Sequence, residues 1–192
     1  MLKSLTLENL TVFADADLSF SDGLNVFIGG NGSGKTHLLK MLYSIPAVSW
    51  EEGRRSQGAA PTKTAMQARL ADKIVGVFRP EALGRLARRI RGRSRCRAKL
   101  AFQDERRDIA LSFSTASKAE VVIDTLPSAW VETAPAYIPT RELLTIYPNF
   151  LSIYKSRFLE LEETWRDTCV LLGMPVRPGP RDGEITVGCV IK

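Results

Sequence analysis

The chain has 192 residues, of which 44% are hydrophobic, and a formal net charge of +6. This length and apolar content suit one folded globular domain or slightly more. No run of about 18 apolar residues is available to span a bilayer, and the N-terminus lacks the pattern of a signal peptide, so we expect a cytoplasmic protein. The three cysteines Cys96, Cys169 and Cys189 lie far apart and show no ligand spacing, which suggests neither a disulfide framework nor a zinc site.

The N-terminal third of the chain has alternating patterns that predict strands. LKSLTLENLTVF and ADADLSFS are expected to be half-buried strands, and SDG at residues 21–23 marks a turn. LNVFI, residues 24–28, is predicted as a buried strand that leads into a run of glycines. Apolar residues then recur at helical spacing up to Pro46, where we expect the helix to end.

The rest of the chain alternates between helical and extended patterns. Residues 48–64 turn polar and predict a surface insertion, and AMQARLADKIVGVF predicts a helix. PEALGRLARRI predicts a basic amphipathic helix with Leu83, Leu86, Ala87 and Ile90 facing inward, so that residues 79–107 would form an arginine-rich helix and loop. KLAFQ, DIALSFS and AEVVIDTL are expected to be antiparallel strands; APAYIPT and EITVGCVIK predict further strands, and NFLSIYKSRFLEL and EETWRDTCVLLG predict helices.

Residues 29–36 spell GxxxxGKT, the pattern of a phosphate-binding loop. Glycines let the backbone wrap closely around phosphate oxygens, and the N–H groups at the start of the following helix point at the anion. Lys35 would meet the β- and γ-phosphates of ATP, and the hydroxyl of Thr36 would bind Mg²⁺. A Gly-rich turn that matches by chance is the alternative, but the expected strand before it and helix after it favour nucleotide binding. The predicted nucleotide-binding residues are Gly29, Gly30, Asn31, Gly32, Ser33, Gly34, Lys35, Thr36 and His37.

The stretch LTLENLTVFADADLSFSDGLNVFIGGNGSGKTHLLKML resembles the N-terminal part of ABC-superclass ATPase heads, specifically the SMC/RecF-like ATP-binding proteins often called AAA-family ATPases. Residues 136–165 and VFRPEALGRLARRIRG resemble later parts of the same group. The resemblance implies that residues 31–36 contact phosphate and magnesium. It also implies that ATP held between two heads drives dimerisation. Phe13 is a weaker candidate for packing near the adenine, and a core aromatic is the favoured alternative.

Other motifs of a complete head of this kind are missing in their expected form: the LSGGQ-like signature, the Walker B strand ending in Asp-Glu, and the switch histidine. Asp124, at the end of EVVID, is a weak magnesium candidate, and a strand end facing solvent is preferred. Glu142 could sense the γ-phosphate or bind magnesium through water, but a place in the first turn of a helix is preferred. The catalytic residues therefore stay unknown.

The arginine-rich stretch offers a second kind of site. Its side chains could contact nucleic-acid phosphates, or they could form a solvated face that meets acids of a missing lobe. The second interpretation is slightly preferred. The candidate nucleic-acid contacts are Arg85, Arg88, Arg89, Arg93 and Arg95.

The sequence thus predicts an α/β fold: the N-terminal lobe of a P-loop NTPase head, with a mixed sheet, an antiparallel side sheet and flanking helices in a single domain of residues 1–192. We expect it to bind ATP and Mg²⁺ but scarcely to hydrolyse ATP without a second lobe or a second head. One alternative is a small P-loop kinase for a nucleotide or metabolite. Two predicted strands precede the loop, and this favours the head, because such kinases usually carry the loop on their first strand. A nucleic-acid-binding module with a structural loop is the least favoured.

Overall fold

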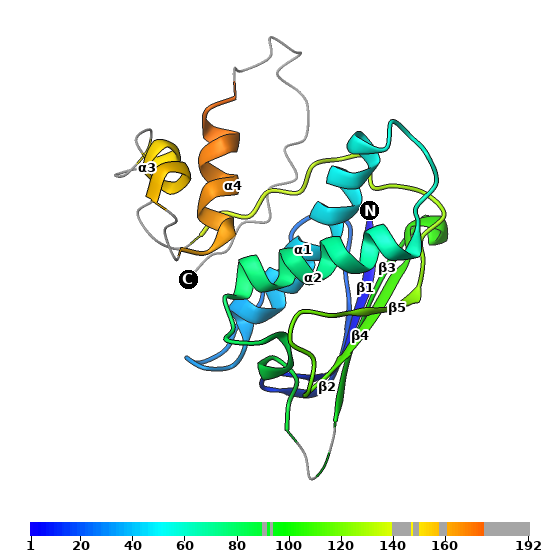
Figure 1. The fold of residues 1–192 in the computed structure, drawn as a ribbon. Helices are drawn as coiled ribbons and strands as arrows, with labels where there is room; N and C mark the ends of the chain where they lie inside the picture. The colour runs from blue at the N-terminus through cyan, green and yellow to red at the C-terminus, as the bar shows by residue number, and fades with distance from the viewer. Residues whose placement is uncertain (90–91, 93, 140–146, 148–149, 158–160, 175–192) are drawn as a thin grey trace. The chain divides into compact units, whose positions relative to one another are not determined.

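The computed structural model describes residues 1–89, 92, 94–139, 147, 150–157 and 161–174. The sequence predicted a single domain, but the chain divides into two compact units, Met1–Pro135 and Ala136–Lys192. Figure 1 shows the helices and strands of both units. Within the described part of the chain, no helix is both long enough and apolar enough to cross a membrane.

The first unit is built on a five-stranded sheet in which every neighbouring pair is antiparallel. Its order is β2-β1-β3-β4-β5, so β2 and β5 are the two edges. The strands are β1 (Leu2–Leu10), β2 (Phe13–Ser19), β3 (Arg95–Phe102), β4 (Ile109–Ser114) and β5 (Val122–Thr125). The predicted N-terminal strands and the later antiparallel strands are therefore confirmed.

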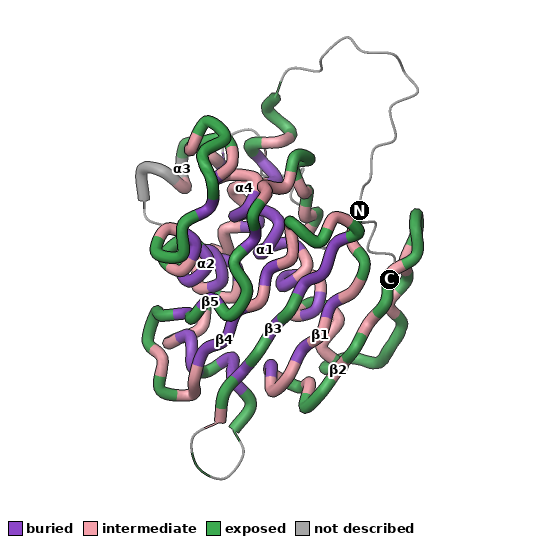
Figure 2. The backbone as a smooth tube through the Cα atoms, turned by 90° about the vertical axis from the view of Figure 1, so that its right-hand side faces the viewer, coloured by how far each residue is buried: buried purple, intermediate pink, exposed green. Residues whose placement is uncertain are grey.

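The register of the sheet sorts the side chains onto two faces. Leu7 pairs with Ala98, and Ala98 pairs with Leu111, so these buried residues share the inner face. Because successive residues of a strand point to opposite faces, Arg97 and Lys99 fall on the outer face, where both are exposed. Figure 2 shows this alternation of buried and exposed positions along β3.

Two helices, α1 (Lys35–Arg55) and α2 (Lys63–Phe78), supply the other half of the core. Their buried residues, among them Met41, Ile45, Leu70 and Ile74, form one apolar cluster with the inner face of the sheet. Figure 1 shows the two helices lying over the sheet.

Helix α1 continues through Pro46 to Arg55, so the helix end predicted at Pro46 is wrong. The surface insertion predicted for residues 48–64 is also wrong over its first half, because residues 48–55 are helical. A proline inside a helix costs one backbone hydrogen bond, but tertiary contacts compensate here. Val48 is buried, and Glu52 forms an ion pair of 3.1 Å with Arg69 of α2.

The basic amphipathic helix predicted after Pro80 is absent from the described residues: the segment contains only a 3-10 turn, η1 (Leu83–Arg85), and the arginine-rich stretch continues into β3. The backbone of this segment instead forms hydrogen bonds with the end of β1 and the turn that follows it. The N–H of Thr11 donates to the carbonyl of Leu86 at 2.7 Å, and the N–H of Arg88 donates to the carbonyl of Asn9 at 2.7 Å. These long-range bonds hold the segment extended beside β1, although Leu83, Leu86 and Ala87 point inward as the pattern predicted.

The segment that precedes the glycines differs most from expectation. Residues 24–28 form no strand, and Leu24, Val26 and Ile28 are 64%, 54% and 93% exposed. The predicted buried strand is therefore an irregular segment without a ladder partner within the described residues. The α/β class, the antiparallel sheet and the flanking helices are confirmed, while a parallel part of the sheet around this segment is not seen among those residues.

The second unit contains α3 (Phe150–Arg157) and α4 (Glu163–Leu172), in line with the two predicted helices. Among its described residues, Phe150 and Cys169 are buried in an apolar cluster, and the ring of Phe150 lies 6.1 Å from that of Trp165. Residues 134–139 form no strand, so the short strand predicted for APAYIPT is wrong over that stretch. The strand predicted at residues 184–192 lies outside the described residues.

Candidate nucleotide-binding site

The predicted phosphate loop connects the exposed segment 24–28 to the N-terminus of α1. Gly32 and Gly34 have backbone φ angles of 78° and 92°, values that residues other than glycine rarely adopt. Residues 29–33 are exposed. The glycines therefore allow a bend that presents the loop to solvent.

Gly34 is also packed against the turn between β1 and β2. A Cβ atom at Gly34 would lie 2.5 Å from Cγ2 of Val12 and 2.7 Å from the ring of Phe13, closer than real Cβ contacts allow. Only glycine fits between this turn and the helix. Phe13, the weak adenine candidate, thus packs beside the loop and also joins the apolar cluster of the sheet.

The Lys35 ammonium lies over the loop. Its Nζ donates to the carbonyl oxygens of Gly29 and Gly30, at 2.6 and 2.8 Å, and lies 3.3 Å from Oγ of Ser33. The helix has no side-chain cap at Gly34, and its first backbone hydrogen bond runs from Leu38 N–H to the Gly34 carbonyl at 2.9 Å. An ammonium group and uncapped N–H groups at one end of a helix are the donors that a phosphate chain requires, so these residues fit a nucleoside triphosphate.

His37 and Thr36 occupy different positions at the helix start. His37 lies with its Nδ1 3.0 Å from Oγ1 of Thr11, and its ring is 5.6 Å from that of Phe78. These contacts favour a role in holding the β1–β2 turn against α1 rather than direct nucleotide contact. Thr36 is exposed beside the loop, where its hydroxyl can serve as the predicted magnesium ligand.

The two candidate carboxylates are not brought to the loop in the described part of the chain. Asp124 is exposed on β5, the edge strand opposite β2, and this favours the solvent-facing alternative. Glu142 lies outside the described residues. Among those residues, no group of three or more His, Cys, Asp or Glu side chains is placed to hold a metal ion.

Three of the arginines predicted to contact nucleic acid form hydrogen bonds within the protein. Arg85 donates to the Glu81 carboxylate at 3.0 Å, and Arg95 lies 3.4 Å from Oγ of Ser112. Arg88 donates to the carbonyl of Val12 at 3.0 Å, and so ties the arginine-rich segment to the turn that packs on Gly34. No local sequence pattern predicts this link, because the two residues are far apart in the chain. Arg93 lies outside the described residues.

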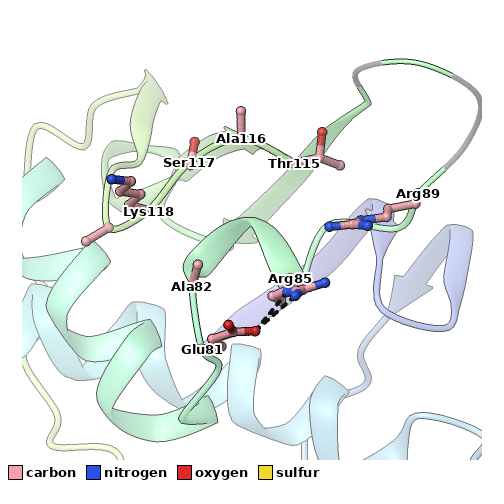
Figure 3. A pocket seen from close by; sticks show the side chains of 9 residues that line it. Glu81, Ala82, Arg85, Arg89, Thr115, Ala116, Ser117 and Lys118 are labelled. Carbon is pink, nitrogen blue, oxygen red and sulfur yellow. Dashed lines mark hydrogen bonds and ion pairs between the residues drawn. The ribbon is translucent and has the colours of Figure 1, made fainter.

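Arg85 and Arg89 also line an open pocket of about 450 Å³ between the η1 segment and the turn that follows β4. Figure 3 shows Arg85 and Arg89 on the η1 side and the residues from Thr115 to Lys118 on the turn side.

Comparison with known proteins adds a family match and several short local similarities. The profile of the AAA ATPase domain family matches residues 1–123. The DNA replication and repair proteins RecF of Streptococcus gordonii and Macrococcus caseolyticus are each 48% identical to this chain over 44 residues. That of Cytophaga hutchinsonii is 43% identical over the same number of residues. In each case the match covers 23% of this chain and 12% of the relative, a small part of the relative's length.

Proposed function

The chain belongs to the AAA ATPase domain family, and from this membership we propose that it binds ATP through the loop of residues 29–36. The observation that supports the proposal most directly is the geometry of Gly34 and Lys35. The helix start is uncapped at Gly34, and the Lys35 ammonium lies over the loop. Family membership favours this function over the P-loop kinase.

Magnesium would be bound beside the nucleotide by the Thr36 hydroxyl and by phosphate oxygens. The ion supplies positive charge that stabilises the charge developing on the transferred phosphoryl group. The residues of this chain bind and orient: the loop amides and Lys35 hold the phosphates, while Val12 and Phe13 pack against the loop at Gly34.

We further propose that rapid hydrolysis needs groups from a second lobe or a second head. Hydrolysis requires a positioned base in addition to bound phosphates, and Asp124, the only candidate carboxylate in the described part, lies on the far edge strand of the sheet. The exposed Leu24, Val26 and Ile28 support the same conclusion, because exposed apolar side chains next to the loop offer a surface that another lobe or head could cover. In this proposal the protein acts in the cytoplasm.

A second candidate function is nucleic-acid contact by the arginine-rich segment. It is favoured by Arg89 and Lys99, which are exposed and form no ion pair with any described residue. Such cations would bind phosphates regardless of base sequence. The RecF relatives are named for DNA replication and repair, which agrees with this proposal.

The test of the main proposal is the fate of ATP with the purified chain and Mg²⁺. Binding is followed by calorimetry and products by chromatography. We expect saturable binding, little ADP above background, and a loss of affinity of at least about tenfold in Lys35→Ala, since the ammonium makes charge-assisted contacts with phosphate. Lys63→Ala is the matched control, because Lys63 also begins a helix and should leave affinity unchanged. Equal affinity in the Lys35 variant would overturn the assignment of the loop, whereas rapid ADP formation abolished by Lys35→Ala would overturn the need for a second lobe.

A further inference from the structure

The pocket beside η1 carries a concentration of positive charge outside the nucleotide loop. Three cationic side chains, Arg85, Arg89 and Lys118, and one carboxylate, Glu81, line it. As Figure 3 shows, the arginines come from the segment around η1, while Lys118 comes from the turn after β4. Chain segments that are remote in sequence therefore contribute charges of the same sign to one cavity.

Backbone contacts fix the two walls of this pocket to each other. The N–H of Leu83 donates to the carbonyl of Lys118, and the N–H of Gly84 donates to that of Ser117, both at 2.8 Å. A Cβ atom at Gly84 would collide with the carbonyl oxygen of Thr115, so the close approach requires glycine. The backbone on the two sides of the pocket is thus held in place before a ligand arrives.

The charges in the pocket are mostly uncompensated. Arg89 and Lys118 are exposed and form no ion pair within the described residues. Arg85 pairs with Glu81 at 3.0 Å, but both side chains are more than half exposed, and surface pairs of this kind contribute little. A ligand with negative charge can therefore recruit Arg85 in addition to the two open cations.

We propose that this pocket is a second phosphate-binding site, distinct from the glycine loop, and that it holds the phosphodiester backbone of a nucleic acid. Arg89 and Lys118 each contact a phosphate of this backbone, and the hydroxyl of Thr115, which makes no hydrogen bond with a described residue, donates to one of these phosphates. This assignment rests on the proposed nucleic-acid contact and adds to it Lys118 and Thr115, which lie outside the arginine-rich stretch.

The shape and lining of the pocket favour a polymer over a free nucleotide. Small-molecule sites usually enclose most of the ligand, whereas this pocket is open to solvent. None of the described residues that line it is aromatic, so it offers no surface for stacking a base. Contacts restricted to the backbone predict binding that is independent of sequence and strongly dependent on salt.

The experiment measures anisotropy of labelled single-stranded and duplex oligonucleotides of about 20 nucleotides and mixed sequence, with the full chain, over a series of salt concentrations. Arg89→Glu/Lys118→Glu reverses the two open charges. Lys3→Glu/Lys63→Glu is the charge-matched control, because both lysines are exposed and form no ion pair within the described part of the chain. Arg97→Glu/Lys99→Glu tests the outer face of the sheet, and circular dichroism checks that every variant folds. If the charge reversal prevents folding, Arg89→Gln/Lys118→Gln takes its place.

We expect the pocket variant to lose at least about tenfold in affinity and to reduce the salt slope by about 1.4 for single strands and about 1.8 for duplexes, as expected when two phosphate contacts are lost. The control should bind like the wild type.

Loss of binding in the sheet-face variant with full binding in the pocket variant would overturn the assignment of the pocket but keep the nucleic-acid contact. Absence of binding to any oligonucleotide at low salt would overturn both. Inorganic pyrophosphate is tested with the Lys35→Ala variant, so that the glycine loop does not contribute to its binding. If this variant binds pyrophosphate but no oligonucleotide, the phosphate in the pocket does not come from a nucleic acid. ATP binding measured on the same samples separates these failures from a failure of the nucleotide site.

Discussion

Two apolar parts of the first unit, the inner face of the sheet and the segment 24–28, differ in how far their side chains are buried. On the inner face, Leu7 and Leu111 are fully buried beneath α1 and α2. In the segment that leads to the phosphate loop, Val26 and Ile28 are more than half exposed. Both stretches have residues suited to strands, so the difference comes from the partner and not from the local pattern.

This contrast shows what an apolar strand pattern predicts. It indicates a segment able to pair and to be covered, but burial requires another element to lie against it. The inner face has two helices from the same chain. The segment 24–28 ends in the functional loop and has no ladder partner within the described residues, which is the feature that the proposed second lobe or head would complete.

The largest expected effect lies on the inner face. Phe113 of β4 is 2% exposed, and Phe113→Ala should lower the free energy of unfolding by about 3 to 5 kcal/mol, because it removes buried apolar surface and leaves a cavity. Urea unfolding followed by circular dichroism measures the change, and Val26→Ala is the control that should leave stability nearly constant. A loss below about 1 kcal/mol for Phe113→Ala would mean that the inner face is not a closely packed core.

An intermediate effect is expected where the exposed segment meets the folded core. Gly34→Ala combines a positive φ of 92° with a collision against Val12 and Phe13, and it should cost about 1 to 3 kcal/mol of stability together with ATP affinity. Gly23→Ala separates the two causes, since Gly23 has φ of 106° but nothing within 4 Å of the added Cβ. Equal losses in the two variants would show that packing against the turn contributes nothing.

Removing the apolar character of the exposed segment should change stability very little. For Val26→Ser/Ile28→Ser we expect the free energy of unfolding to stay within about 0.5 kcal/mol of the wild type, because these side chains are already in water. Self-association, measured by light scattering at rising concentration, should decrease as the apolar surface shrinks. A stability loss above about 2 kcal/mol would contradict the exposed placement and show that the segment is buried in solution.

The smallest expected effect is a difference in thiol reactivity between the buried inner face and the exposed segment 24–28. Burial, and secondarily the charge of Glu8, raises the pKa of Cys96 from 9.0 to about 12. Since the folded-state pKa is above the unfolded value, the protonated thiol favours the folded state below about pH 9, and that contribution is lost as the pH rises toward 12. Native Cys96 should therefore resist alkylation at pH 8, whereas a cysteine introduced by Val26→Cys should react quickly.

Mass spectrometry of peptides after timed alkylation gives both rates in one sample. The wild-type chain serves as the reference for Cys96, and denatured protein gives the rate of the unprotected thiol. Equal rates for native and denatured Cys96 would contradict its burial on the inner face.

The phosphate loop and most of the strands could be predicted because their signals are local. Leu5 and Leu7 alternate with polar residues, and the glycines before Lys35 are required by the bend that they make. The pattern also predicted which residues around Leu83 and Leu86 point inward. It predicted the wrong backbone for them, since helical spacing is equally compatible with a 3-10 turn followed by an extended segment bonded to Asn9 and Thr11.

By itself, the sequence determined the strand periodicity, the glycine loop and the excess of positive charge, because side-chain alternation, backbone freedom and net charge are properties of neighbouring residues. Only the tertiary structure decided that α1 passes through Pro46, that Arg88 reaches Val12, and that Lys118 shares a pocket with Arg89. Each of these depends on hydrogen bonds, ion pairs or apolar contacts between residues far apart in the chain. Such contacts can outweigh a local preference, and no local pattern encodes them.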